Sequence, residues 1–367
     1  MKNFITILFV FIVMIPVSCI HEDDTPVKIP PTESAVLSPE VGGPAEQNQI
    51  WIQLSAQPAN AMKSTPREAW DLGFYSGEDF RVILNSSLVM AVGKIKNAYN
   101  IDEVNAQTIG DMMNWVQVGN FQDNSQYVDN PNGEILTQTS GIAPIEANDN
   151  FNNVYLLNMG YKAYTGNTVP GSIYSIGEER GWKKIRILRT TGGYKIQYAD
   201  LDQTTHQEFT ITKDAEYNYQ FFSIVKGALA NIQPKKNSWD LCFTVFTNTI
   251  LNPTNNLLTS YIFPDFVVTN TLGNVVAYEV TTAPGQGEAA YSRFKLQDVD
   301  ATKFVLHEQR TIGSNWRTTT GSNGVEVYSN KFYVVKNSDG FYFKLRFLRM
   351  KNNEGYRGYP QFEYKAL

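Results

Sequence analysis

The segment WDLGF at residues 70–74 returns as WDLCF at residues 239–243. Each copy follows a polar turn that contains a proline, Pro66 or Pro234, and each runs into a segment rich in Asn, Thr or Ser. The chain has only 6 Trp residues, so a repeated Trp-Asp pair with the same apolar pattern predicts a duplicated domain. We expect the two copies to be equivalent core strands.

Strand alternation in the first copy puts Trp70, Leu72 and Phe74 on one face and Asp71 on the other. The Asp71 carboxylate is then placed to cap a neighbouring turn. No His or second acid accompanies the Trp-Asp pair, so we favour a structural role over a catalytic one.

Further matches support the duplication. Residues 209–212 match an opening strand at 50–54, and KLRFLR at 344–349 matches KIRILR at 184–189. These matches occur in the same order in both halves of the chain, but the number of residues between them differs. This difference indicates insertions in loops. Alternation puts Lys184 and Arg186 on one strand face, and likewise Lys344 and Arg346; for the second pair we favour a solvated face over an anion site.

The composition favours β-structure. Hydrophobic residues make up 42% and aromatic residues 13% of the chain, in short alternating runs broken by Gly, Asn and Pro. The net charge of −5 and the lack of a basic stripe argue against nucleic-acid binding. We predict an all-β fold with two tandem antiparallel domains, residues 43–203 and 204–367.

The N-terminus predicts export. Lys2 precedes an apolar run, residues 4–17, that ends at Ser18 and Cys19. This pattern fits a bacterial lipoprotein signal peptide, residues 1–18, with Cys19 as the lipidated residue; ordinary secretion with another cleavage site is the alternative. If Cys19 carries lipid, Cys242 has no cysteine partner within the chain.

Residues 19–42 are predicted to form a flexible tether, because they are rich in Pro, Ser and Glu and lack apolar periodicity. The acidic cluster at residues 20–24 resembles the surface-export signal of Bacteroidetes lipoproteins. A solvated tether is the other explanation for that charge run.

Enzyme motifs are absent from the sequence. It contains no His-Glu-x-x-His, no paired Cys-x-x-Cys, no P-loop and no dinucleotide glycine fingerprint. Its acidic residues are not paired with His, so we predict that the protein is not an enzyme.

Residues 239–243, 312–316 and 332–364, above all DGFYFKLRF at 339–347, resemble HmuY-family lipoproteins of Bacteroidetes. Typical members have one such domain, so this chain looks like a tandem pair. The resemblance implies an outer-membrane, surface-exposed lipoprotein that captures haem and passes it to a TonB-dependent receptor. A protein that kept the fold and lost the iron ligands is the alternative.

The resemblance also implies where iron ligands belong. Members often place a His directly after the Trp-Asp strand, whereas this chain has Tyr75 and Thr244 there. His206 and His307 match neither position, so a bis-His site in one domain is not expected. No metal beyond a haem iron is expected.

Candidate haem ligands are therefore the tyrosine Tyr75 and the thioethers of Met90, Met112 and Met113. Core packing is the competing explanation for each of these side chains, because Met often fills irregular gaps in protein cores.

Overall fold

The computed structural model describes residues 34–119, 123–137, 140–320 and 324–367. Strands dominate these residues, and the two α-helices among them are short: α1, Ala106–Ile109, and α2, Gly287–Arg293. The all-β prediction is confirmed. The predicted signal peptide and the lipid-bearing Cys19 lie outside the described residues.

The strands form two units, each a five-stranded sheet packed on a four-stranded sheet. The first unit contains β4 (Leu72–Tyr75), β5 (Val82–Leu84), β6 (Ala91–Lys94), β7 (Val154–Asn158), β8 (Trp182–Thr190), β9 (Gly193–Asp200), β10 (Gln207–Thr212), β11 (Tyr219–Ser223) and β12 (Ala228–Ala230). The second unit contains β1 (Ala35–Leu37), β2 (Asn48–Ile52), β3 (Met62–Pro66), β13 (Leu241–Leu251), β14 (Leu258–Thr269), β15 (Val276–Thr281), β16 (Arg317–Thr318), β17 (Glu326–Val327), β18 (Lys331–Lys336), β19 (Tyr342–Lys351) and β20 (Arg357–Ala366).

Short 3-10 helices join the strands. They are η1 (Gly43–Ala45), η2 (Pro58–Asn60), η3 (Arg67–Ala69), η4 (Ser86–Leu88), η5 (Ile101–Glu103), η6 (Met112–Asn114), η7 (Ser125–Tyr127), η8 (Asp149–Phe151), η9 (Thr271–Gly273), η10 (Leu296–Asp298) and η11 (Ala301–Lys303). None of the described helices has the length and apolar character needed to cross a membrane.

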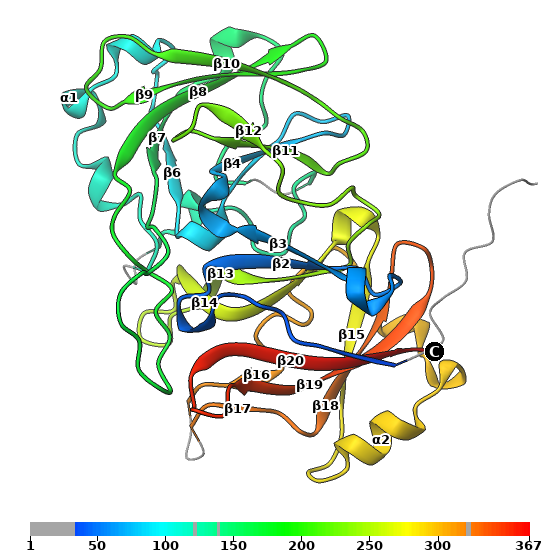
Figure 1. Cartoon of the computed structure of the whole chain (residues 1–367). Helices are drawn as coiled ribbons and strands as arrows, with labels where there is room; N and C mark the ends of the chain where they lie inside the picture. Colours follow the sequence, from blue (N-terminus) through cyan, green and yellow to red (C-terminus); the bar gives the residue numbers. More distant parts are fainter. Residues whose placement is uncertain (1–33, 120–122, 138–139, 321–323) are drawn as a thin grey trace, which may run out of the picture.

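The two units have the same strand order. The sheets β12-β11-β4-β5 and β10-β9-β8-β7-β6 of the first unit correspond to β3-β2-β13-β14 and β1-β20-β19-β18-β15 of the second. The first unit is continuous in sequence, whereas the second is built from both ends of the chain. Figure 1 shows β2 and β3 beside β13 and β14, in a stack of four layers.

The N-terminal strands complete the second unit through antiparallel pairing. β1 pairs with β20, with Ala35 opposite Tyr364, and β2 pairs with β13, with Ile52 opposite Leu241. The predicted tether is therefore wrong at its C-terminal end, because residues 35–37 form a strand of the folded protein.

Strand pairing does not divide at the predicted boundary between residues 203 and 204. β10 pairs with β9, and β11 pairs with β4, so residues 207–230 belong to the first unit. The match of residues 209–212 to residues 50–54 is also wrong. The shared sheet order makes β10 the counterpart of β1 and β11 the counterpart of β2.

Main-chain contacts repeat between the units. The Asp71 N–H donates to the Phe222 carbonyl at 2.9 Å, and the Asp240 N–H donates to the Ile52 carbonyl at 2.6 Å. Each pair joins a Trp-Asp block to a strand from the other half of the sequence. These equivalent contacts support the duplication that the repeated block predicts.

The repeated lysines are buried, against the predicted solvated face. Lys184 and Lys344 are 0% and 4% exposed, and their Nζ atoms donate to the carbonyls of Val104 and Tyr291, both at 2.5 Å. The segments between β6 and β7 and between β15 and β18 fold over the sheet and supply these acceptors. Burial without a paired carboxylate lowers the pKa of both lysines.

Each unit has its own core between its two sheets, and a third cluster lies between the units. In the first unit, Leu72 and Phe74 of β4 face Ile185 and Ile187 of β8. The cluster between the units contains these side chains: Trp51, Trp70, Ile135, Tyr219, Phe221, Ile232, Trp239, Cys242, Phe246, Phe266 and Val268.

We expect the fragment 204–367 not to fold alone. It lacks β1–β3, so β13 and β20 lose their pairing partners, and it carries β10–β12 without the sheets that hold them. Far-UV circular dichroism during heating should show no cooperative transition for this fragment.

A circular permutant provides the control. Because Ala35 lies opposite Tyr364, residues 34–66 can follow Leu367 through a short Gly/Ser loop in a chain that begins at residue 67. We expect this permutant to unfold cooperatively, like the natural chain. Cooperative unfolding of fragment 204–367, or failure of the permutant to fold, would contradict the observed pairing.

Candidate functional site

The two Trp-Asp blocks meet where the units pack together. η3 ends before Trp70 and β4 begins at Leu72, so Trp70 precedes the strand and turns toward the other unit. Leu72 and Phe74 point into the core of the first unit. The predicted common face is therefore wrong for Trp70, because alternation applies only within the strand.

The Asp side chains of the two blocks are structural. The carboxylate of Asp71 accepts the Ile224 N–H at 2.7 Å, and that of Asp240 accepts the Leu54 N–H at 2.7 Å. Both N–H groups belong to turns, so the predicted capping role of Asp71 is confirmed. Asp71 also forms a buried ion pair with Arg180 at 2.5 Å.

Aromatic pairs repeat at this interface. Trp51 packs edge to face on Trp239 with ring centroids 4.9 Å apart, and Phe221 packs similarly on Trp70 at 4.6 Å. Each such contact contributes about 0.5–1.5 kcal/mol beyond its buried area. Each pair lies within one unit, and all four rings belong to the apolar cluster between the units. The three tryptophans also line a cavity there.

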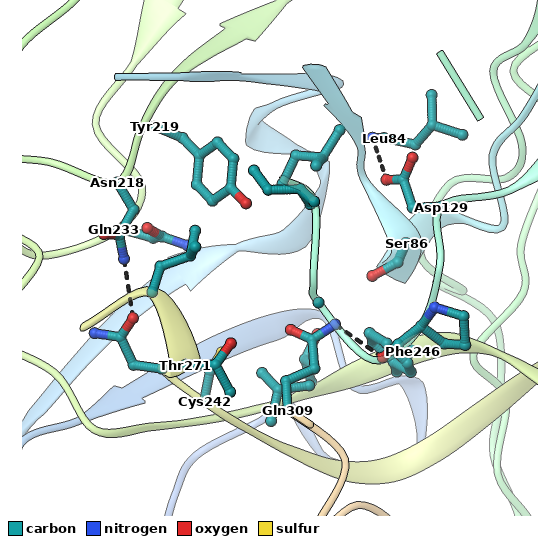
Figure 2. Close-up of a pocket in the computed structure, with 18 of the residues that line it drawn as sticks. Leu84, Ser86, Asp129, Asn218, Tyr219, Gln233, Cys242, Phe246, Thr271 and Gln309 are labelled. Atoms are coloured by element: carbon teal, nitrogen blue, oxygen red, sulfur yellow. Dashed lines mark hydrogen bonds between the residues drawn. The ribbon is translucent and has the colours of Figure 1, made fainter. Parts of the chain in front are cut away.

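A cavity of about 120 Å³ lies between the units. β2, β13 and the segments after β12 and β14 contribute to its walls, as do η4 and the loop around Asp129. Figure 2 shows Ser86, Tyr219, Gln233 and Gln309 at different sides of this space. We refer to it as the central cavity.

Most polar groups of the central cavity have partners. The two carboxylate oxygens of Asp129 accept the N–H groups of Leu84 at 2.6 Å and Gly141 at 3.1 Å. Burial nevertheless raises the pKa of Asp129 to about 7. Across the interface, the Asn218 amide donates to the side-chain oxygen of Asn270 at 2.9 Å.

The positions after the Trp-Asp strands are occupied by packed side chains. Thr244 is buried; its hydroxyl donates to the Val245 carbonyl at 2.8 Å and accepts from Gln49 at 3.1 Å. Tyr75 is half-buried, with its ring centroid 6.0 Å from that of Tyr219. Burial raises the pKa of the Tyr75 hydroxyl, which disfavours tyrosinate.

The predicted methionines lie in two places. Met90 is 1% exposed, belongs to the core of the first unit and borders the central cavity. Met112 and Met113 are half-buried on η6 and pack in the cluster that includes Ala91 and Leu156. The structure therefore brings Met112 and Met113 together, with Met90 and Tyr75 in other clusters.

A second cavity of about 250 Å³ adjoins η6. Met113, Tyr161 and Trp182 are among its lining residues, and Trp115 nearby in sequence is 44% exposed. This combination of a partly accessible thioether with aromatic side chains sets the η6 surface apart from the closed core around Met90. We refer to it as the η6 cavity.

Both described histidines have carboxylate partners. His206 Nδ1 lies 2.8 Å from Asp102, and His307 Nδ1 lies 2.7 Å from Glu134. Within the described ranges, no group of three or more His, Cys, Asp or Glu side chains is arranged to hold a metal ion.

The sequence did not reveal the central cavity. Its polar residues, such as Gln49, Asp129, Gln233 and Gln309, come from segments far apart in the chain. No local motif connects them, and they meet only where the two units pack together. The repeated Trp-Asp block was the one signal that pointed to this region.

The fold and cavities define an all-β protein of two similar sandwich units. A family model described as HmuY protein matches residues 45–364, and the chain belongs to this family. The resemblance that the sequence motifs indicate is thus confirmed.

Solved structures give weaker similarities. A candidate lipoprotein of Bacteroides fragilis is 14% identical with a TM-score of 0.22, covering 50% of this chain and 88% of that one. Apo PinO from Porphyromonas gingivitis is 12% identical with a TM-score of 0.16, covering 50% and 97%. No curated protein matches this chain.

We expect Asp129 to make stability fall as pH rises between about 4 and 7. Its pKa is about 7 in the folded state and about 3.9 when unfolded, so only the folded state keeps the proton in this range. The loss should approach about 1.4 kcal/mol per pH unit. Urea unfolding at pH 4.5, 5.5 and 6.5 measures it.

Asp129→Asn isolates this contribution, because the amide does not titrate. The variant should lose one acceptor for a backbone N–H at every pH, yet gain stability relative to the natural protein as pH rises. Parallel stability curves for the two proteins would show that Asp129 is ionised throughout.

Proposed function

We propose that this protein is a surface-anchored lipoprotein that binds haem or a related porphyrin and delivers it to an outer-membrane receptor. Membership of the HmuY family carries the proposal. The apolar run that ends at Ser18 and Cys19 supports export and lipid attachment at Cys19. The proposed partner, a TonB-dependent receptor, rests on the family alone.

We place the porphyrin at the η6 cavity. Met113 lines this cavity and is half-buried, so its thioether can reach a ligand without opening a core; Met112 precedes it on η6 and is also half-buried. Thioether sulfur is a soft ligand that suits reduced iron. Tyr161 and Trp182 line the cavity and add aromatic surface for the faces of a porphyrin, and Trp115, which follows η6, is exposed.

The other predicted ligands are less suitable. The central cavity beside Met90 is about 120 Å³, less than half the volume of the η6 cavity, and Met90 itself is 1% exposed. Tyr75 packs against Tyr219, and its raised pKa opposes the anionic form that binds iron. These observations favour Met112 and Met113 over Tyr75 and Met90.

A surface lipoprotein that binds no haem is the second candidate. The observation that favours it is Thr244, which occupies one of the two positions where the family often has His. Both hydrogen bonds of its hydroxyl are made inside the protein. Tyr75 at the other position is likewise packed.

We expect hemin to bind the soluble chain, residues 20–367, with a shifted Soret band that sharpens on reduction. Met112→Leu with Met113→Leu removes both thioethers at little cost in packing. This double variant should weaken binding about tenfold or more, and optical titration under oxidising and reducing conditions measures the change.

Met350→Leu is the matched control, because Met350 is a buried thioether in the core of the second unit. It should leave the Soret titration unchanged. A flat titration of the natural chain in both redox states would favour the second candidate. Unchanged binding by the double variant would place the porphyrin elsewhere.

A further inference from the structure

The hairpin of β13 and β14 extends far beyond its counterpart in the first unit. β13 and β14 have 11 and 12 residues, whereas the equivalent strands β4 and β5 have 4 and 3. Pairing in the second unit continues outward from Leu241 opposite Thr269 to Leu251 opposite Leu258. The core of the second unit uses the inner part of this hairpin, at Leu241 and Phe243. The outer part is therefore a departure from the duplication.

The first unit holds the stem of this hairpin. The Thr247 hydroxyl donates to the Ser86 carbonyl at 2.7 Å, and the Ser260 N–H donates to the side-chain oxygen of Asn124 at 2.8 Å. These contacts fix the direction of the hairpin along the surface of the first unit. Residues 251–258, which we call the hairpin tip, lie beyond them.

Hydrogen bonds within the hairpin tip fix its turn. The Asn256 N–H donates to the Asn252 carbonyl at 2.8 Å, and the Asn252 N–H donates to the Leu257 carbonyl at 2.9 Å. The side-chain oxygen of Asn252 accepts the Thr254 N–H at 2.9 Å. That of Asn255 accepts the Leu257 N–H at 3.1 Å. The tip is thus pre-organised, and these internal hydrogen bonds lower the cost of removing its polar groups from water.

Large apolar side chains are exposed at this end of the hairpin. Leu251 is 59% exposed, Leu257 is 40% exposed and Leu258 is 46% exposed. Tyr261, further along β14, is 37% exposed. Apolar side chains gathered at the end of an extended hairpin mark a surface that becomes buried in a contact with a protein or a membrane.

The absence of charge distinguishes between these two kinds of partner. Residues 241–264 contain no Asp, Glu, Lys, Arg or His, although 18% of the chain is Asp, Glu, Lys or Arg. A protein partner does not require this, since interfaces between proteins have a polar rim and are enriched in Arg. A lipid bilayer does, because moving an ionised side chain from water into hydrocarbon is costly.

We propose that the hairpin tip inserts into the surface layer of a lipid bilayer. Leu251, Leu257 and Leu258 enter the upper part of the acyl chains, and Tyr261 lies at the head groups, where tyrosine is enriched in membrane proteins. The contact is hydrophobic rather than electrostatic. It requires neither a lipid on Cys19 nor a bound porphyrin, so it does not depend on the proposed function.

Vesicle binding by the soluble chain, residues 20–367, tests the proposal. We expect this chain to sediment with phosphatidylcholine vesicles, and to bind equally well at low and high salt because no ion pair contributes. Leu257→Asn with Leu258→Asn places amides at two exposed apolar positions. This double variant should weaken the partition into vesicles about tenfold or more.

Val225→Asn with Leu229→Asn is the matched control. These side chains are 68% and 46% exposed on the first unit, away from the hairpin tip. The control removes as many exposed apolar side chains as the Leu257→Asn, Leu258→Asn variant does. Its binding to vesicles should equal that of the natural chain.

A fluorescent label reports the depth of the hairpin tip. Cys242 is the one cysteine of the soluble chain, and it is buried. A polarity-sensitive fluorophore attached to Leu257→Cys should therefore label the tip alone. Its emission should shift to the blue when vesicles are added and should be quenched by nitroxides on the acyl chains. The same fluorophore on Leu229→Cys should show neither effect.

Three results would overturn the proposal. One is a natural chain that does not sediment with phosphatidylcholine vesicles. Another is an unchanged partition of the Leu257→Asn, Leu258→Asn variant when circular dichroism shows that it is folded. The third is self-association of the natural chain that this variant abolishes, without quenching of the label at Leu257→Cys by acyl-chain nitroxides. That result would assign the hairpin tip to a contact between two copies of the chain.

Discussion

The pairing of β2 with β13 is the interaction on which the rest of this structure depends. Backbone N–H and carbonyl groups in a buried sheet must find partners, and β13 finds them on a strand nearly two hundred residues earlier in the chain. This pairing closes the second unit and places Gln49 and Trp51 beside the second Trp-Asp block. The central cavity exists because of it, since one wall comes from β2 and another from β13.

The duplication places equivalent Trp-Asp blocks at the interface, and the two units differ beside these blocks. Turn capping by Asp71 and Asp240 is repeated, which is expected where the contact maintains the fold. The pair Gln49 and Tyr219 breaks the repeat next to the cavity. An exact repeat would give Trp239 an acceptor equivalent to the one that Gln49 gives Trp70.

The sequence was sufficient for the β class, the duplication and the capping role of Asp71, because each depends on local pattern. The sequence was not sufficient to predict which strands pair with each other. Equivalent strands of two repeats have similar patterns of apolar and polar residues. The local sequence therefore does not indicate that β1–β3 pair with strands of the second half. The prediction of a solvated lysine face was wrong for a related reason. Lys184 and Lys344 alternate along their strands as expected, but segments distant in sequence cover them and supply carbonyl acceptors. The predicted common face was wrong for Trp70 because β4 begins two residues later, at Leu72.

The strand arrangement also bears on how an anchored protein presents its cargo. A lipid on Cys19 would be connected through residues 20–33 to β1, which pairs with β20 in the outer sheet of the second unit. The η6 cavity is lined by residues of the first unit, along η6 and at the ends of β7 and β8 that adjoin Asn158 and Trp182. β1 and the residues that line the η6 cavity thus belong to different units.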